Sequence, residues 1–304
     1  MEALLQRLDR AEALAQTGKL GRFLADPLRY ALGTGFTHLA YPLLRRAWHT
    51  EADTFFQKKM RVALPGGLDI FLTGAKTHPS EIRLARYLVR SLKAGDGFVD
   101  IGAHFGFFSL LASQLVGEHG AVLAFEPSPA SFQLLAENTR ACANTQAIRQ
   151  AVSEKNDVLS FFEFPTRYSE YNALHVGQYE QEPWFGKYRP REIRTPSVAL
   201  DSFLDSMPDF YPTLVKIDVE GAEDRVLSGM RRTLNEANAP TVVMEFLADR
   251  PGSSHERAAH LLFETGYAAF LIDGQGDLVP VPDIPAGLRA LGLESDNIAF
   301  RKKA

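Results

Sequence analysis

Three shortages narrow the class of protein before any motif is considered. Cys142 is the single cysteine among 304 residues, which excludes an intramolecular disulfide and fits a reducing compartment. The 33 Lys and Arg residues are outnumbered by 37 Asp and Glu residues, so no basic surplus points to a nucleic-acid partner. No run approaches the roughly 20 apolar residues that span a bilayer, so we expect no integral membrane segment.

The amino-terminal stretch also lacks the apolar core and cleavage site of a signal peptide, because charged residues interrupt its leucines. Apolar residues make up 45% of the chain and charged residues 23%, as in an ordinary globular protein. We therefore expect a cytoplasmic protein. Its length fits one large domain with an appendage, which we divide into a helical extension over residues 1–60 and a main domain over residues 61–304.

The extension is expected to be helical because its apolar residues recur at helical spacing over residues 4–15 and again over residues 38–48. The second stretch sets leucines beside Arg45 and Arg46. We expect its apolar face to pack on the main domain or on a second subunit, which would make a homo-oligomer through the N-terminal helices. Contact with a membrane surface is the less favoured alternative.

The segment after the extension predicts a hairpin and then a helix. Residues 60–64 and 68–72 are mostly apolar segments that flank a Pro-Gly-Gly turn, which is a β-hairpin signal. Ser80 is expected to cap a helix that ends near residue 92. Glu81 in its first turn has two open interpretations: it borders the amino-acid end of a ligand, or it stabilises the helix dipole.

The stretch that follows predicts a ligand site. Residues 98–101 form a short, largely apolar run, as expected for a strand that is covered on both faces. Gly102 and Gly106 allow a sharp turn close to a ligand, and residues 107–116 have apolar positions at helical spacing. Ligands of open α/β sheets bind at the carboxyl ends of such strands, beside the helix N-terminus.

The charge of this turn indicates which ligand binds. Asp100 precedes Gly102, and the spacing differs from the G-x-G-x-x-G fingerprint of dinucleotide-binding folds. A carboxylate at that position repels a pyrophosphate but suits S-adenosylmethionine, which carries a sulfonium and an α-ammonium group. Glu126 follows a second apolar strand over residues 121–125 and is placed to accept hydrogen bonds from ribose hydroxyls.

The rest of the chain continues the alternation of strands and helices. Ser128 and Pro129 are expected to start the next helix as its N-cap and first-turn residues. Further core strands are expected at residues 148–152, 213–217, 241–246, 267–272 and 297–300, with an edge strand at 158–164. Residues 165–192 form a long insert rich in aromatic residues, which we interpret as a lid or an acceptor-binding loop.

Four blocks of this sequence resemble the FkbM family of S-adenosylmethionine-dependent methyltransferases: 99–106, 124–128, 200–204 and 216–223. They occur in the family's order, and the resemblance covers roughly residues 77–250. It implies a class I methyltransferase fold, an α/β Rossmann-like architecture with a seven-stranded, mostly parallel sheet and an antiparallel last strand. It also implies O-methylation of a hydroxyl on a sugar, a glycan or a secondary metabolite, so we expect a small-molecule or glycan acceptor.

The resemblance also assigns cofactor residues. Asp100 and Gly102 would line the methionine part, Glu126 would bind the ribose hydroxyls, and Val152 would lie near the adenine. Position 104 is often Asn in such sequences and is His here, so its contact to the ligand is not assumed to be the same. The full set of candidate cofactor residues is Glu81, Asp100, Gly102, Ala103, His104, Gly106, Glu126, Ser128 and Val152.

A hydroxyl acceptor must lose its proton, which requires a base or a metal ion. Asp218 is the first candidate for a base or a metal ligand, Glu220 and Glu245 are next, and His175 in the insert is another candidate base. Asp218 and Glu245 would hold Mg²⁺ as a second cofactor. The open alternative is that the carboxylates around residues 218–223 only stabilise a helix start and that Lys216 pairs with one of them.

Two other functions remain open at this point. A nicotinamide-dependent oxidoreductase would share the strand, turn and helix, although Asp100 and the missing third glycine argue against it. A catalytically silent assembly protein would keep the cofactor pocket without turnover.

Overall fold

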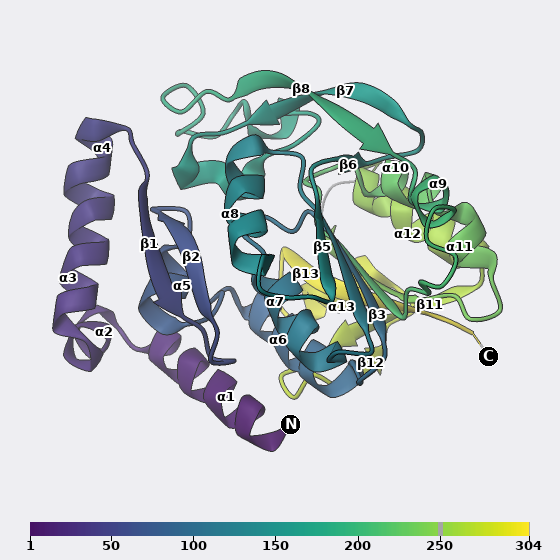
Figure 1. The fold of residues 1–304 in the computed structure, drawn as a ribbon, viewed down its shortest axis with the longest axis horizontal. Coiled ribbons are helices and arrows are strands. Elements are labelled where there is room, and N and C mark those ends of the chain that lie inside the picture. The colour runs from purple at the N-terminus through teal and green to yellow at the C-terminus, as the bar shows by residue number, and fades with distance from the viewer. Residues whose placement is uncertain (249–251, 304) are drawn as a thin grey trace.

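The computed structural model describes residues 1–248 and 252–303, and its centre is an eight-stranded sheet with the order β12-β11-β13-β10-β9-β3-β4-β5 (Figure 1). Five neighbouring strands, β10, β9, β3, β4 and β5, are parallel, and β13 runs antiparallel between β10 and β11. The strands of this sheet are β3 (Gly97–Ile101), β4 (Ala121–Phe125), β5 (Thr145–Ile148), β9 (Leu214–Ile217), β10 (Thr241–Leu247), β11 (Tyr267–Ile272), β12 (Leu278–Pro280) and β13 (Ser295–Lys302).

This sheet confirms the expected α/β fold with a mostly parallel sheet and an antiparallel last strand. The short edge strand β12, which pairs with β11, makes eight strands instead of the expected seven. The helices are α1 (Glu2–Gln16), α2 (Lys19–Ala25), α3 (Pro27–Gly35), α4 (Tyr41–Leu44), α5 (Leu68–Thr73), α6 (Pro79–Ser91), α7 (Phe107–Val116), α8 (Pro129–Thr139), α9 (Leu200–Leu204), α10 (Glu223–Ser228), α11 (Arg231–Asn235), α12 (Ser254–Glu264) and α13 (Ile284–Ala290).

Alternate residues of the core strands face two helical layers, because successive side chains of a strand point to opposite faces. Phe98 of β3 packs in the apolar cluster that contains α1, α6 and α7, whereas Val99 packs in the cluster that contains α9 to α12. Figure 1 shows the strands between these two groups of helices. All five residues of β3 are buried, as the apolar run predicted.

The N-terminal helices attach to one side of this core. α1 lies against α6, where the guanidinium of Arg86 donates hydrogen bonds to Asp9 (2.7 Å) and Glu12 (2.8 Å). α3 continues through a π-helical turn, η1 (Phe36–Ala40), into α4, so the second helical stretch ends at Leu44 and not at Trp48. Among the described residues, no helix is both long and apolar enough to cross a membrane.

The predicted hairpin is wrong. Strand β2 (Lys59–Leu64) pairs antiparallel with β1 (Trp48–Asp53), and residues 68–73 form helix α5. The apolar residues Leu68, Phe71 and Leu72 have helical spacing, and so short a run fits a helix as well as a strand. The hairpin of β1 and β2 covers residues 48–64, so it crosses the boundary that we placed at residue 60. The division into two domains stays a prediction.

Two further details differ from the expectation. The segment 148–152 is not one strand: β5 ends at Ile148, and β6 (Ala151–Val152) joins a separate sheet with β7 (Asp157–Glu163) and β8 (Arg191–Val198). Helix α6 begins at Pro79, so Ser80 does not cap it, and its Oγ lies 2.6 Å from Nδ1 of His78. Ser128 does cap α8, as predicted, by accepting a hydrogen bond from the backbone N–H of Ser131.

Among the described glycines, Gly102 leaves the least room for an added Cβ, and this gives the first testable prediction. Its φ is +80°, and a Cβ there would lie 1.8 Å from the carbonyl oxygen of Asp218. Gly95 has a similar φ of +94°, but a Cβ at that position would meet nothing within 4 Å. We expect Gly95→Ala to cost about 1–2 kcal/mol of unfolding free energy, from left-handed strain alone, and Gly102→Ala to cost clearly more. Denaturant unfolding of both variants measures the difference, and equal losses would contradict the steric argument.

Candidate active site

A cavity of about 370 Å³ opens at the carboxyl ends of β3, β4, β9 and β10, where ligands of parallel α/β sheets bind. The insert covers one side of it with residues 169–172 and Leu174, which lie in and around its short helical turns η2 (Thr166–Tyr171) and η3 (Gly177–Tyr179). The candidate site residues that line the cavity are Glu81, Gly102, His104, Glu126, Val152, Asp218, Glu220 and Glu245.

The remaining candidates lie outside this lining. Asp100 is buried under the cavity, and Ala103 and Gly106 shape the turn, where Gly106 precedes α7 with a φ of +88°. The hydroxyl of Ser128 is used within the fold, because it donates to Glu163 (2.6 Å) in addition to capping α8. His175 is exposed, so the structure gives it no contact with the cavity.

The backbone of His104 shapes the cavity more directly than its ring does. Its φ is +50°, a left-handed conformation that His and Asn adopt more readily than most residues. Its ring stacks on Phe105 at 3.7 Å, and Nε2 lies 2.9 Å from the hydroxyl of Ser169 in the insert. Burial lowers the pKa of His104 to about 4, so the ring is neutral near pH 7.

Glu126 is held in a fixed orientation at the end of β4. One carboxylate oxygen accepts a hydrogen bond from the backbone N–H of His104 (2.8 Å), and the other accepts one from the N–H of Ser128 (2.9 Å). Burial raises the pKa of Glu126 to about 7, although both hydrogen bonds act in the opposite direction. Because Glu126 lines the cavity and each of its oxygens accepts one of these bonds, the carboxylate can also accept hydrogen bonds from ligand hydroxyls.

A buried ammonium group lies under the floor of the cavity. Lys216 Nζ lies 3.2 Å from Oδ1 of Asp100 and 3.3 Å from Oδ2 of Asp218, and it donates to the carbonyl of Gly102 at 3.4 Å. Burial acts to lower the pKa of Lys216, but the two carboxylates raise it above its usual value. The open alternative that Lys216 pairs with one of the carboxylates around residues 218–223 is therefore confirmed for Asp218. Asp100 is a second partner that this alternative did not name, and its other oxygen accepts a hydrogen bond from Ser109 (2.6 Å).

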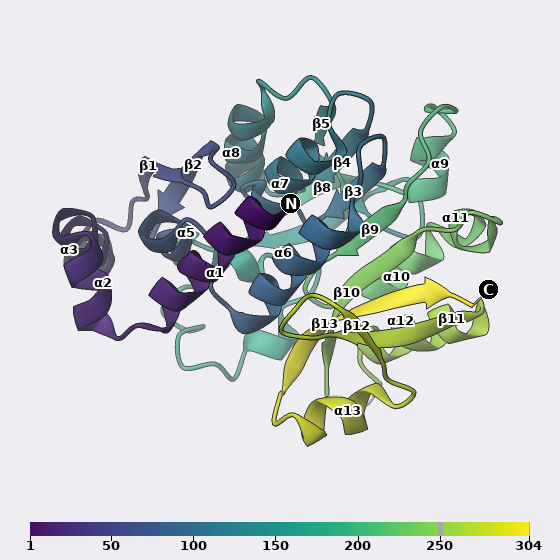
Figure 2. The ribbon, with the colours of Figure 1, turned by 90° about the horizontal axis from the view of Figure 1, so that it is seen from below.

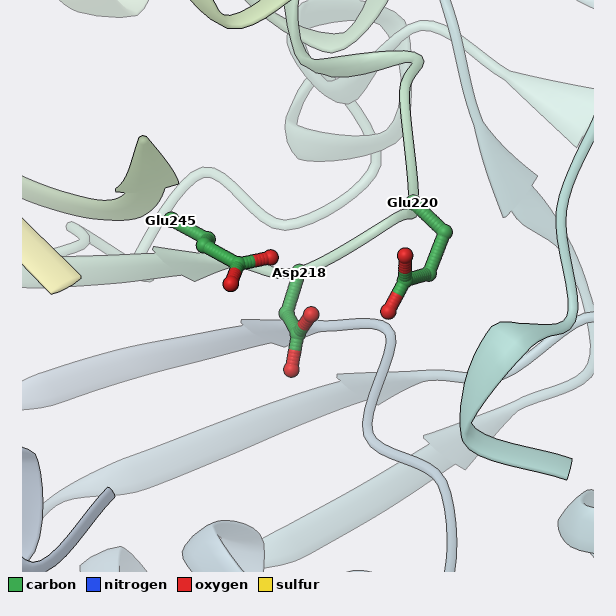
Figure 3. A group of neighbouring side chains, drawn as sticks. All are labelled: Asp218, Glu220 and Glu245. Atoms are coloured by element: carbon green, nitrogen blue, oxygen red, sulfur yellow. The ribbon is translucent and has the colours of Figure 1, made fainter. Parts of the chain in front are cut away.

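The carboxylates of Asp218, Glu220 and Glu245 meet beyond this lysine (Figure 3). One oxygen of each lies within 4.8 Å of one oxygen of the other two. Burial acts to raise the pKa of Asp218, yet Lys216 and the neighbouring Lys76 hold it below its usual value. Burial raises the pKa of Glu245 to about 7 and that of Glu220 well above its usual range, and the neighbouring carboxylates act in the same direction.

Glu220 is further restrained by its backbone and by the insert. Its φ of +55° is a strained conformation for this residue type, of the kind found at functional sites. The hydroxyl of Tyr179 donates a hydrogen bond to its carboxylate, and the side-chain amide of Gln178 donates to its backbone carbonyl (3.2 Å). The insert is therefore attached directly to the acidic cluster.

Sequence reasoning missed Lys76 and Glu170, which both line the cavity. The ammonium of Lys76 forms an ion pair with Glu81 and lies 3.3 Å from Oε1 of Glu170 in the insert. Lys76 lies in the loop before α6 and Glu170 lies in η2, so no local pattern links them. Only the folded chain brings this pair together.

Known methyltransferases resemble the part of the chain that carries this geometry. A family model described as the methyltransferase FkbM domain matches residues 100–268. The hexuronic acid methyltransferase AglP of Haloferax volcanii is 29% identical over 154 residues, and the match covers 50% of this chain and 57% of the relative. The methyltransferase sdnD of Sordaria araneosa is 27% identical over 168 residues, and the match covers 47% of this chain and 64% of the relative. The match thus spans less than two thirds of either relative's length.

Solved structures are similar at lower identity. An O-methyltransferase of Bacillus cereus, crystallised in complex with SAH, is 10% identical, with a TM-score of 0.40 and coverage of 74% of this chain and 81% of that chain.

The raised pKa of Glu245 predicts a pH-dependent stability. An acid whose pKa rises from 4.5 to about 7 on folding binds more protons in the folded state, so the free energy of unfolding falls as the pH rises through this window. Glu245→Gln removes that cost. We expect the variant to be more stable than the unsubstituted chain by on the order of 3 kcal/mol at pH 8 and by only about 1 kcal/mol at pH 5.

Denaturant unfolding at the two pH values measures this difference. Glu118→Gln is the matched control, because Glu118 is exposed in a turn and its replacement should change stability equally little at both pH values. A Glu245→Gln effect that does not grow with pH would contradict the interpretation.

Proposed function

Since the chain belongs to the FkbM methyltransferase family, we propose that it transfers the methyl group of S-adenosylmethionine to a hydroxyl of a sugar, a glycan or a secondary metabolite. The observation that carries the proposal is the acidic cavity at the carboxyl ends of the parallel strands. Six carboxylates line it against one ammonium group, that of Lys76; the six are those of Glu81, Glu126, Glu170, Asp218, Glu220 and Glu245.

The residues of this cavity fit the proposed cofactor. An excess of carboxylates attracts a sulfonium and an α-ammonium group and repels the pyrophosphate of a nicotinamide dinucleotide. Glu126, oriented by two backbone N–H groups, would accept the ribose hydroxyls. The turn at Gly102 and His104 brings backbone to the cavity wall without an intervening side chain at position 102. Val152 lines the part of the cavity nearest to β6, where we place the adenine.

The chain's own residues must orient the acceptor hydroxyl and take its proton. The bound cofactor supplies a methyl group that the sulfonium already activates, so positioning carries much of the catalysis. Asp218 is the proposed base, because Lys216 and Lys76 keep its carboxylate ionised while it lines the cavity. Glu220 and Glu245 have raised pKa values because they are buried beside other carboxylates, and they are proposed to hold a cation next to this base.

The same three carboxylates would hold Mg²⁺. Carboxylate oxygens are the ligands that this ion prefers, and those of Asp218, Glu220 and Glu245 gather within 4.8 Å. A divalent cation there would offset their mutual repulsion and lower the pKa of an acceptor hydroxyl. Glu220 thereby joins the pair, Asp218 and Glu245, that sequence reasoning proposed for the metal.

The charge of the cavity also favours a neutral acceptor. An acceptor that carries its own carboxylate would enter a site lined by six acidic side chains and one ammonium group. The raised pKa values of Glu126, Glu220 and Glu245 show that this site already disfavours further negative charge. We therefore propose a neutral polyhydroxyl compound for this chain, in contrast to the hexuronic acid in the name of its relative AglP.

Calorimetric titration tests the cofactor. We expect S-adenosylmethionine to bind and NAD not to bind, and we expect Glu126→Ala to weaken S-adenosylmethionine binding at least about five-fold through loss of the ribose hydrogen bonds. Glu118→Ala is the matched control on an exposed turn. Tight NAD binding, or unchanged affinity in a folded Glu126→Ala variant, would sink the assignment.

Methyl transfer to matched acceptors tests the acceptor and the metal. Neutral glycosides and the corresponding uronic acids are compared as acceptors, with Mg²⁺ and with a chelator. We expect at least about tenfold faster methylation of the neutral member of each pair and slower transfer with the chelator. Faster methylation of the uronic acids would refute the neutral acceptor. Cofactor binding without turnover on any acceptor would support a catalytically silent protein instead.

A further inference from the structure

The helices α2 to α4 form a ridge at one edge of the molecule, apart from the central sheet (Figures 1 and 2). Within this ridge, α3, η1 and α4 form one long helix over residues 27–44. One side of this helix packs on the rest of the chain. Gly33, Thr37 and Tyr41 are spaced four residues apart and are buried on that side. A Cβ at Gly33 would lie 3.0 Å from the side chain of Phe71, so this side is in close contact with α5.

The opposite side of the same helix is apolar and exposed. Leu28, Leu32, Leu39 and Leu43 follow one another at spacings of four, seven and four residues, so they share a face, and their exposed fractions are 70%, 47%, 72% and 85%. Eight of the fifteen exposed large apolar side chains of the described residues belong to this ridge. We call these eight the leucine ridge: Leu20, Phe23, Leu24, Leu28, Leu32, Leu39, Leu43 and Leu44.

Such a concentration of exposed apolar side chains marks a surface that is covered by a partner. From the sequence we expect residues 38–48 to pack on the main domain or on a second subunit. The structure excludes the main domain for Leu39, Leu43 and Leu44, which remain exposed, and assigns the core contact to Tyr41.

The charge of the ridge distinguishes between the remaining partners. Residues 17–47 contain five basic side chains, Lys19, Arg22, Arg29, Arg45 and Arg46, and one acidic side chain, Asp26, which gives a net charge of +4. Arg29 is paired with Asp53 of β1 (3.2 Å), so the surplus at this surface is +3. The whole chain has a net charge of −4, so the other residues carry −8. A twofold interface would place the same positive surface against itself. An anionic partner complements it.

The positive charge continues from the ridge into the insert. The guanidinium of Arg45, at the end of α4, lies 4.4 Å from the ring centroid of Tyr188, and Nζ of Lys187 lies 5.6 Å from the same centroid. Arg45 also donates a hydrogen bond to the backbone carbonyl of Lys187 (3.5 Å). Two cations from distant parts of the sequence thus gather at one end of the leucine ridge.

We propose that the leucine ridge docks on an anionic lipid membrane. The apolar side chains enter the boundary between headgroups and acyl chains, and Lys19, Arg45, Arg46 and Lys187 contact the anionic headgroups. At 1.5 Å per residue the helix of residues 27–44 is about 27 Å long, enough to lie in the plane of the interface. Docking stands on the exposed surface alone and does not rest on the proposed methyl transfer.

Vesicle co-sedimentation of the full chain tests this proposal. Phosphatidylcholine vesicles with about one third phosphatidylglycerol are compared with pure phosphatidylcholine vesicles, because anionic headgroups attract basic segments. We expect binding to the anionic vesicles that weakens with added salt and at least about tenfold weaker binding to the neutral ones. Absence of binding to anionic vesicles by the folded chain would overturn the proposal.

Substitutions in the ridge test its location. Leu39→Ser/Leu43→Ser should weaken vesicle binding at least about tenfold, because two exposed leucines no longer enter the lipid. The matched control is Val158→Ser/Leu291→Ser, which replaces two apolar side chains of 48% and 59% exposure outside the ridge. Equal binding of both double variants would overturn the assignment of the ridge.

Sedimentation of the lipid-free chain tests the other occupant. A stable dimer that dissociates on Leu39→Ser/Leu43→Ser would show that a second copy covers the leucine ridge and would overturn membrane docking. Calorimetry of the same double variant with S-adenosylmethionine should give unchanged affinity, so failure of docking can be told apart from failure of the proposed function.

Discussion

The ion pair between Lys216 and the two aspartates is the interaction on which the candidate site depends. In the parallel ladder of β3 and β9, Asp100 and Lys216 are direct partners, so their side chains leave the sheet at the same place. Burying these carboxylates without a cation would cost several kcal/mol for each ion. Nζ of Lys216 lies 3.2 Å from Oδ1 of Asp100 and 3.3 Å from Oδ2 of Asp218. This cation allows Asp100 to remain buried while Asp218 faces the cavity. The backbone N–H of Asp218 donates to the carbonyl of Ile101 (3.0 Å) and links the two strand ends, which come so close that only glycine fits at position 102.

This arrangement separates the acids of the site into two kinds. Asp218, beside Lys216 and Lys76, has a lowered pKa, whereas Glu126, Glu220 and Glu245 have raised pKa values because burial dominates. A base that is ionised near neutral pH therefore lies among groups that hold their protons more tightly, which is the pattern expected of acid–base chemistry. Positive charge delivered by a cofactor or a metal ion would stabilise the ionised forms of all of them. The acidic cavity is thus an electrostatic complement to a cationic ligand.

The part of this site that could be predicted from the sequence is the part made by neighbouring residues. The strand before Gly102, the helix after Gly106, the position of Glu126 and the cap at Ser128 each follow from a local pattern of apolar, glycine and capping residues. Lys76 and Glu170 could not be predicted, because they meet across almost a hundred residues and neither belongs to a motif. The assignment of residues 68–72 as a strand failed for a different reason: a five-residue apolar run does not distinguish a strand from one turn of helix. His175 shows the limit of reading an insert, since residue type alone does not tell which side chains face inward.

The most direct test of this account is a double-mutant cycle on Lys216 and Asp100, read as the free energy of unfolding. Lys216→Met should lower that free energy by about 3–5 kcal/mol, because it leaves buried carboxylates without their cation. Adding Asp100→Asn to the same chain should recover a large part of the loss, since the buried charge is then removed as well. A Lys216→Met variant as stable as the unsubstituted chain, or a double variant no more stable than the single one, would contradict the claim that this buried ion pair holds the site together.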